Sequence, residues 1–165
     1  LYESQYNLFE EKNESLLKVA KFIAKSFLSM SNTINKKFIE NLNQNNPKFS
    51  VNIIESWFIR YNKGGVVFPH DHGKCSWCCV YYVQIGKDAD AQKNGSTYFL
   101  RPYFGRTQDD FGGKFYSSVS RGIFKAEEGK MLIWPNFLLH GSHPYSGEKN
   151  RIIISANANI NLRNS

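Results

Sequence analysis

The sequence lacks several features on which membrane and secreted proteins depend. No apolar run approaches the roughly 20 residues that span a bilayer, and no basic and then apolar start resembles a secretory signal. Only three cysteines occur among 165 residues, and they lie together at Cys75, Cys78 and Cys79. Such an odd, tight cluster argues against a disulfide scaffold and favours a reducing, cytoplasmic compartment.

Acidic residues are also scarce, with 14 Asp and Glu against 21 Lys and Arg, so the net charge is +7. The positive charge is spread along the chain and forms no polybasic block. Dispersed charge is typical of a solvated exterior, so we expect neither a nucleic-acid nor a membrane partner. With 41% hydrophobic and 15% aromatic residues, the chain is long enough to bury a core of its own.

The chain divides near residue 47 into two regions of different texture. Apolar residues recur at helical spacing through 1–46, which predicts an N-terminal helical support and a second helix from Ser31. The candidate caps of the first helix are Asn13-Glu14-Ser15 and Ser4. Region 47–165 alternates aromatic and β-branched runs with turn residues, which predicts a mainly β core, a sandwich or barrel. The predicted strands are 51–61, 66–71, 76–84, 97–101, 121–125, 130–134 and 150–159.

Two segments stand apart from these strands. The segment 101–122 is aromatic, charged and rich in glycine, and long loops in compact domains are usually functional, so we expect it to close over a substrate. The apolar stripe of the N-terminal helices requires a covering surface. We expect it to pack on the outer sheet or to form a homodimer contact.

The four histidines fall into two short windows, one containing His70 and His72 and the other His140 and His143. Alternate residues of a strand point to the same face, so His70 and His72 can project together while Asp71 turns away. A third ligand from a distant strand would complete a three-cornered metal site with open positions, as in non-haem Fe(II) oxygenases. The clustering favours a metal site over ordinary surface histidines.

Arg151 begins a strongly apolar predicted strand, and Ser155 and Asn157 share its face. A buried guanidinium needs an anionic partner because an unpaired buried charge is costly. A substrate carboxylate could supply that partner through paired hydrogen bonds. The alternative is an arginine at the rim of the protein that pairs with an acid such as Glu148.

Taken in order over residues 51–160, these motifs resemble the 2-oxoglutarate- and Fe(II)-dependent dioxygenases. The matching segments are Trp57…Pro69-His70-x-His72, Cys75-Ser-Trp-Cys-Cys-Val-Tyr-Tyr-Val83, Trp134-Pro-Asn-Phe-Leu-Leu-His140-Gly and Arg151-Ile-Ile-Ile-Ser155. The pattern is most similar to a small bacterial and phage group with His-x-His, and its second segment is similar to a strand of the hypoxia-sensing prolyl hydroxylases. The wider superfamily has His-x-Asp, so His72 stands where a carboxylate is usual.

The resemblance implies a double-stranded β-helix, or jelly roll, with Fe(II) bound by His70, His72 and His140. The implied activity is 2-oxoglutarate-dependent hydroxylation of an unidentified protein, peptide or small-molecule substrate, with dioxygen consumed and succinate and CO2 released. Similarity to prolyl hydroxylases suggests a peptidyl substrate. The three histidines and Arg151 are the expected catalytic residues.

The resemblance also assigns residues to 2-oxoglutarate. Arg151 and the Tyr82 hydroxyl are expected to bind its distal carboxylate, and Tyr61 is expected to reach its other end. Ser155 is expected to assist Arg151, but Ile153 occupies the position that the family's serine takes. The alternative for Tyr82 is a core aromatic ring whose hydroxyl bonds a backbone group.

Other interpretations use the same residues differently. A compact zinc site could be formed by His70, His72, Cys75 and Cys78, although a regular strand over 76–82 would place these ligands poorly. The chain could also be a cupin-like metalloenzyme that does not use 2-oxoglutarate, a non-enzymatic jelly-roll module, or a basic nucleic-acid demethylase. These three interpretations account less well for the arginine and tyrosine of the predicted cofactor site.

Overall fold

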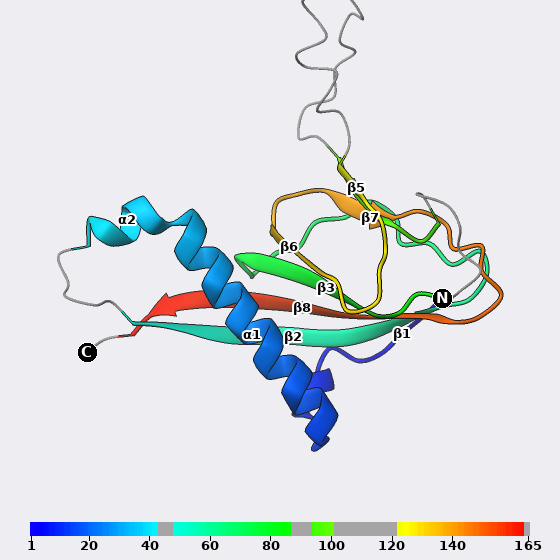
Figure 1. Cartoon of the computed structure of the whole chain (residues 1–165), viewed down its shortest axis with the longest axis horizontal. Helices are drawn as coiled ribbons and strands as arrows, with labels where there is room; N and C mark the ends of the chain where they lie inside the picture. The colour runs from blue at the N-terminus through cyan, green and yellow to red at the C-terminus, as the bar shows by residue number, and fades with distance from the viewer. Residues whose placement is uncertain (43–47, 87–93, 101–121, 164–165) are drawn as a thin grey trace, which may run out of the picture.

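The computed structural model describes residues 1–42, 48–86, 94–100 and 122–163, and these form two antiparallel β-sheets with N-terminal helices. The larger sheet has the order β1–β2–β8–β3–β6 and the smaller one β5–β4–β7 (Figure 1). The strands are β1 (Tyr2–Glu3), β2 (Phe49–Tyr61), β3 (Trp77–Gln84), β4 (Thr97–Phe99), β5 (Gly122–Phe124), β6 (Met131–Pro135), β7 (His140–Ser142) and β8 (Arg151–Leu162). The protein is therefore mainly β, as its sequence predicts.

Most of the predicted strands correspond to observed ones. Six of them match β2, β3, β4, β5, β6 and β8, with ends shifted by up to three residues. The prediction of a strand at 66–71 is wrong, because this segment contributes only an isolated bridge between His70 and His140. The sequence does not predict β7, because the three residues His-Gly-Ser carry no apolar alternation.

The N-terminal region is less helical than its apolar periodicity predicts. Helix α1 is Glu14–Ile34, and before it come the edge strand β1 and a single 3-10 turn, η1, at Leu8–Glu10. The Asn13 side chain accepts hydrogen bonds from two backbone N–H groups of the first turn, at 2.9 and 3.1 Å, so Asn13 is the N-cap. The expected start of a second helix at Ser31 is wrong, because α1 continues through it and α2 is Lys36–Glu40.

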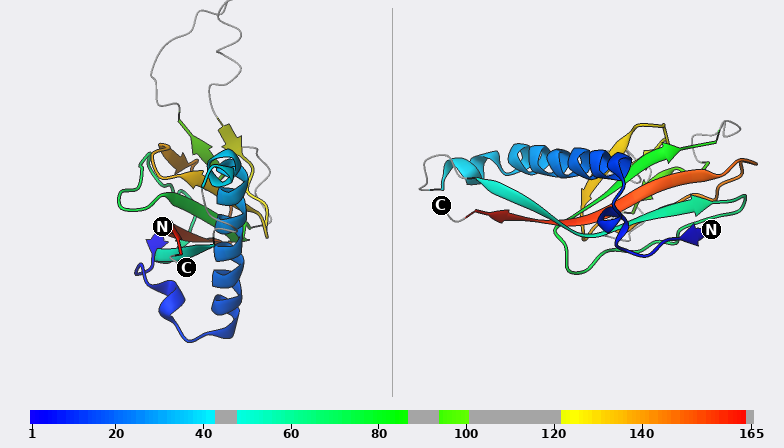
Figure 2. Two further views of the ribbon diagram at one scale, coloured as in Figure 1. Left: turned by 90° about the vertical axis from the view of Figure 1, so that its left-hand side faces the viewer. Right: turned by 90° about the horizontal axis from the view of Figure 1, so that it is seen from below.

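Alternation along the long strands separates two hydrophobic clusters. Helix α1 crosses β2 and β8 (Figures 1 and 2), and it places the fully buried Ile23 and Phe27 against Cys79 and Ile154 on the outer face of the larger sheet. The inner face carries a cluster of aromatic and aliphatic side chains from β2, β3, β6 and β8. Its members include Trp57, Ile59, Tyr61, Cys78, Val80, Tyr82, Trp134 and Ile153. The candidate site lies on this inner face.

The packing of α1 and the pairing of β1 with β2 join the N-terminal region to the sheet. The division into a support at 1–46 and a core at 47–165 stays a prediction. The predicted closing segment, 101–122, lies outside the described residues except for Gly122. Within the described ranges, no helix is both long and apolar enough to span a membrane.

Replacing Phe27 with Ala should lower the free energy of unfolding by about 3–5 kcal/mol, because it deletes a fully buried ring and leaves a cavity under α1. Phe38→Ala is the matched control, since this ring is 66% exposed and its loss should change stability by less than about 0.5 kcal/mol. Urea denaturation followed by circular dichroism measures both. Equal effects would contradict the packing of α1 on the sheet.

Candidate metal and cofactor site

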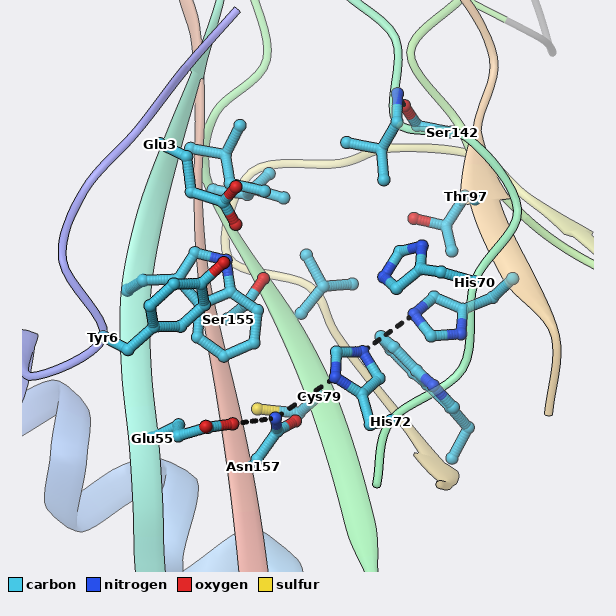
Figure 3. Close-up of a pocket in the computed structure, with 18 of the residues that line it drawn as sticks. Glu3, Tyr6, Glu55, His70, His72, Cys79, Thr97, Ser142, Ser155 and Asn157 are labelled. Atoms are coloured by element: carbon cyan, nitrogen blue, oxygen red, sulfur yellow. Dashed lines mark hydrogen bonds between the residues drawn. The ribbon is translucent and has the colours of Figure 1, made fainter. Parts of the chain in front are cut away.

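Three histidines from two segments converge on the inner side of the fold. The ligand nitrogens of His70, His72 and His140 lie within 4.8 Å of one another (Figure 3). Reciprocal backbone hydrogen bonds join two of these residues: the His70 N–H donates to the His140 carbonyl at 2.9 Å, and the His140 N–H donates to the His70 carbonyl at 3.0 Å. This bridge places the first window of histidines beside the second, as a three-cornered metal site requires.

His72 is positioned by a separate pair of contacts, both with Asn136. The His72 N–H donates to the Asn136 carbonyl at 3.2 Å, and the Asn136 side-chain amide donates to the His72 carbonyl at 3.0 Å. Asp71 is exposed and lies outside the cluster, in agreement with the alternation argument. His72 therefore faces the other two histidines and its neighbour Asp71 does not.

Backbone contacts orient the rings of His70 and His140 for metal binding. Each Nδ1 lies 2.8 Å from the carbonyl oxygen two residues earlier, that of Phe68 for His70 and that of Leu138 for His140. Because a carbonyl oxygen can only accept, each Nδ1 carries the proton and each Nε2 keeps its lone pair, which in His140 lies 3.3 Å from the His72 Nε2. An imidazole fixed through one nitrogen in this way presents the other to a metal.

Burial favours the neutral form of His72 and His140. Burial lowers the pKa of His140 from 6.5 to about 4, and the neighbouring histidines lower it further, against the opposing effect of the Leu138 carbonyl. Burial also lowers the pKa of His72, and His70 adds to this shift. Neutral imidazole is the form that binds metals, so these two side chains are ready to accept a divalent cation at neutral pH. Three nitrogen donors suit Fe(II) and related transition metals.

Arg151 is buried farther along the inner face of β8. It is 1% exposed, and its Nε, Nη1 and Nη2 atoms have no hydrogen-bond partner among the described residues. Its guanidinium lies 4.2 Å from the ring centroid of Tyr61 and 5.4 Å from that of Tyr82. The alternative of a rim arginine paired with Glu148 is wrong, because Glu148 is exposed and pairs with Lys63.

Three further residues are expected at the cofactor, and the structure places each of them differently relative to Arg151: Tyr82, Tyr61 and Ser155. The Tyr82 hydroxyl bonds the Thr97 hydroxyl at 2.6 Å, and the Thr97 backbone also acts on it. Tyr61 pairs with Arg151 in the β2–β8 register, so it lies at the arginine end and not at the opposite end of the site. Ser155 is four residues farther along β8, so its Cα lies about 13 Å from that of Arg151 at roughly 3.3 Å per residue, and its part in binding the carboxylate stays a prediction.

A cavity of about 350 Å³ connects these groups between the two sheets. The histidine cluster, Tyr61, Thr97 and Ser155 line it, and Arg151 lies against the Tyr61 ring. The wall also contains residues that the sequence analysis does not assign to the site: Glu3, Tyr6, Glu55, Thr97 and Asn157. Glu55 carries a signal in the sequence, because it interrupts the apolar alternation that Trp57, Ile59 and Tyr61 continue on the inner face of β2.

The cysteines do not join the metal cluster. Among the described residues, the group of side chains that could hold a metal contains His70, His72 and His140, and neither Cys75 nor Cys78. The sulfur atoms of these two cysteines lie 3.6 Å apart, and burial raises the pKa of both thiols. All three cysteines are free and buried. The structure therefore gives no support to a zinc site of mixed His and Cys ligands.

The family model described as "Putative 2OG-Fe(II) oxygenase" matches residues 55–157. This match covers more than half of the chain and includes the three histidines and Arg151. The protein therefore belongs to the 2-oxoglutarate- and Fe(II)-dependent oxygenase family, as the resemblance of its motifs indicates. No curated protein gave a significant match.

Solved structures of oxygenases share the fold at low identity. AviO1 from Streptomyces viridochromogenes is 14% identical with a TM-score of 0.57, over 96% of this chain and 66% of that one. HygX from Streptomyces hygroscopicus, solved with nickel and 2-oxoglutarate, is 11% identical with a TM-score of 0.51, over 94% and 70%. A Pseudomonas putida prolyl-4-hydroxylase is 14% identical with a TM-score of 0.50, over 88% and 66%. The chain spans 55–58% of three further matched chains.

The stability of the metal-free protein should fall as the pH drops from about 6.5 to about 4. The pKa of His140 is lowered in the folded state, so the unfolded chain binds more protons within this window and acid favours unfolding. His140→Gln should flatten the stability curve in this range. Urea unfolding at a series of pH values measures the slope. The same slope in His140→Gln as in the parent protein would contradict this account of His140.

Proposed function

We propose that the protein is an Fe(II)- and 2-oxoglutarate-dependent oxygenase that hydroxylates a C–H bond of its substrate. The proposal is carried by one observation: three converging imidazoles and a buried, unpartnered guanidinium lie on the inner side of one fold. In the proposed reaction, 2-oxoglutarate, dioxygen and R–H yield succinate, CO2 and R–OH. One oxygen atom of dioxygen enters succinate and the other enters the product alcohol.

We further propose that the two sheets form a double-stranded β-helix. For this proposal, β2 is strand one. The segment around His70, which forms a bridge to His140 of β7, takes the place of strand two, and β3 to β8 are strands three to eight. The edge strand β1 is not counted. The larger sheet then contains strands one, eight, three and six in order, and the smaller contains two, seven, four and five. Successive strands therefore lie in opposite sheets, except for strands four and five, which pair within the smaller sheet, as in a jelly roll built from two Greek keys.

His70, His72 and His140 would hold the iron through their Nε2 atoms. When bound, iron and 2-oxoglutarate supply the oxidising chemistry that the side chains of the protein lack. The side chains set the geometry and the polarity of the site. The Trp134 ring lies 4.6 Å from the His140 ring and the Trp57 ring 6.0 Å from the His72 ring, so the cluster is bounded by aromatic surface that excludes water.

Arg151 would bind the distal carboxylate of 2-oxoglutarate. Its unpartnered nitrogens can form charge-assisted hydrogen bonds, and stacking on Tyr61 already fixes the plane of the guanidinium. Tyr82 would exchange its hydrogen bond with Thr97 for one with the same carboxylate. A cupin-like enzyme that binds only a metal would leave this buried charge without a role, so the structure favours the oxygenase.

A peptidyl substrate is the finer part of the proposal. The prolyl-4-hydroxylase among the similar structures supports it, and a proline-containing peptide is therefore the first substrate to assay. Release of succinate above the rate without peptide, together with a mass increase of one oxygen atom in the peptide, would support this assignment. Turnover with small molecules alone would contradict it.

Arg151→Met should raise the dissociation constant for 2-oxoglutarate at least about tenfold, because a lost charge-assisted contact costs about 1.5–3 kcal/mol. The same substitution should leave the metal-free protein equally or more stable, since it removes a buried charge that has no counter-charge. Calorimetric titration of the Mn(II)-loaded protein and thermal unfolding measure the two effects.

Arg60→Met is the control for this experiment, because Arg60 is exposed and lies over the Tyr2 ring on the outer face. It should leave 2-oxoglutarate binding unchanged. Unaltered binding in Arg151→Met would contradict the role of Arg151 as the carboxylate ligand.

A further inference from the structure

A polar cluster to which the proposed reaction assigns no role lies beside the histidines on the cavity wall, and its Asn157 amide contacts the His72 ring at 3.2 Å. It consists of Glu3, Tyr6, Glu55 and Asn157, which we call the acidic wall (Figure 3). Glu55 comes from β2 and Asn157 from β8, and the other two come from the N-terminal segment. All four line the same cavity as the histidines, so a molecule in that cavity can reach both.

Backbone hydrogen bonds hold the N-terminal part of this wall in place. The Ser56 N–H donates to the Tyr6 carbonyl at 2.9 Å, and Glu3 pairs with Ile59 in the β1–β2 register. Because Ile59 belongs to the cluster on the inner face, Glu3 also projects toward that face. Burial raises the pKa of the Tyr6 phenol, and the adjacent Glu3 carboxylate raises it further.

The two carboxylates of the acidic wall lack a counter-charge. Neither Glu3 nor Glu55 forms an ion pair with a described residue, and the described lining of the cavity contains no Lys or Arg. Arg60 is next to Ile59 on β2, but it points to the outer face and lies over Tyr2. In a chain of net charge +7, this cavity is a site of local negative potential.

A buried acceptor without a partner accompanies the carboxylates. Asn157 is 1% exposed and its Oδ1 atom has no hydrogen-bond partner among the described residues, while its Nδ2 donates to Glu55 at 2.7 Å. The rings of Tyr6 and Trp57 pack with centroids 4.9 Å apart on the same wall. Carboxylates, an amide oxygen and aromatic faces are together the groups that bind an ammonium or guanidinium ion.

The balance of charge points the same way. Neutral histidines leave a divalent metal and the dianion of 2-oxoglutarate to cancel each other. Arg151 adds one positive charge, so one of the two negative charges of Glu3 and Glu55 remains uncompensated. Leaving that charge beside a dehydrated, neutral substrate would be unfavourable. A cationic group on the substrate removes that penalty.

We infer that the substrate carries an ammonium or guanidinium group and binds it at the acidic wall, which directs a nearby carbon toward the histidine cluster. This inference rests on the proposed oxygenase function and names its substrate class. The same chemistry is found in the basic side chain of a peptide and in a free amine.

The test is a binding assay on protein loaded with Mn(II) and 2-oxoglutarate, followed by tryptophan fluorescence, because Trp57 and Trp134 line the cavity. The cationic probes are the Nα-acetyl, N-methylamide derivatives of lysine and arginine, and cadaverine. The norleucine derivative is the neutral control and the glutamate derivative the anionic one. At least one cation should bind about tenfold or more tightly than norleucine. Preference for the amino-acid derivatives would indicate a peptide, and preference for cadaverine a free amine.

Glu55→Gln and Glu3→Gln should each reduce that preference by several-fold. Glutamine at 55 keeps an oxygen that can accept from Asn157, so it removes the charge and retains the hydrogen bond. Glu40→Gln is the matched control, because it removes the same charge from the surface of α2, where Glu40 lies 3.9 Å from Lys36. This control should bind every probe as the parent protein does.

Norleucine or glutamate binding as tightly as the cations would overturn the inference, and so would the absence of binding by all three cations. A cation preference that persists in both glutamine variants would also overturn it. Titration of 2-oxoglutarate in the same samples separates this failure from that of the proposed function. Binding of 2-oxoglutarate without cation preference defeats only the substrate class, whereas loss of 2-oxoglutarate binding defeats both.

Discussion

A buried guanidinium without an acceptor among the described residues is the constraint on which the site depends. Arg151 is almost fully enclosed, and removing such a charge from water costs several kcal/mol. Stacking against Tyr61 and Tyr82 recovers only part of this, since cation–π contacts contribute roughly 0.5–2 kcal/mol each. The rest of the fold must outweigh the remaining cost. In return, an incoming carboxylate meets donors that are already ordered and dehydrated, which strengthens its binding.

Strand β8 relates this charge to the other end of the cavity. Alternation places Arg151 and Asn157 on the inner face, while Ile154 faces helix α1. The Asn157 amide lies 3.2 Å from the His72 ring and 2.7 Å from Glu55, so one strand carries both the guanidinium and a contact to the metal cluster. Packing of α1 on the outer face protects this arrangement, because a shift of register by one residue would exchange the two faces.

The sequence predicts that His70 and His72 project together, and the family resemblance adds His140. The reason expected from the sequence, strand period, is wrong, because the segment forms only an isolated bridge and Asn136 holds His72 in place. The position of Tyr61 was predicted less well, because it depends on which residues of β2 and β8 are paired. Glu3 and Tyr6 could not be predicted, because β1 joins β2 through backbone hydrogen bonds that leave no side-chain pattern.

The measurement that tests the central claim most directly is the visible absorption spectrum of the Fe(II)-loaded protein, without oxygen, during a titration with 2-oxoglutarate. A keto acid that chelates Fe(II) gives a charge-transfer band. The account predicts a band that grows to saturation with 2-oxoglutarate and is absent when His140 is replaced by Gln. Iron binding without any band would contradict the joint role of the histidine cluster and Arg151.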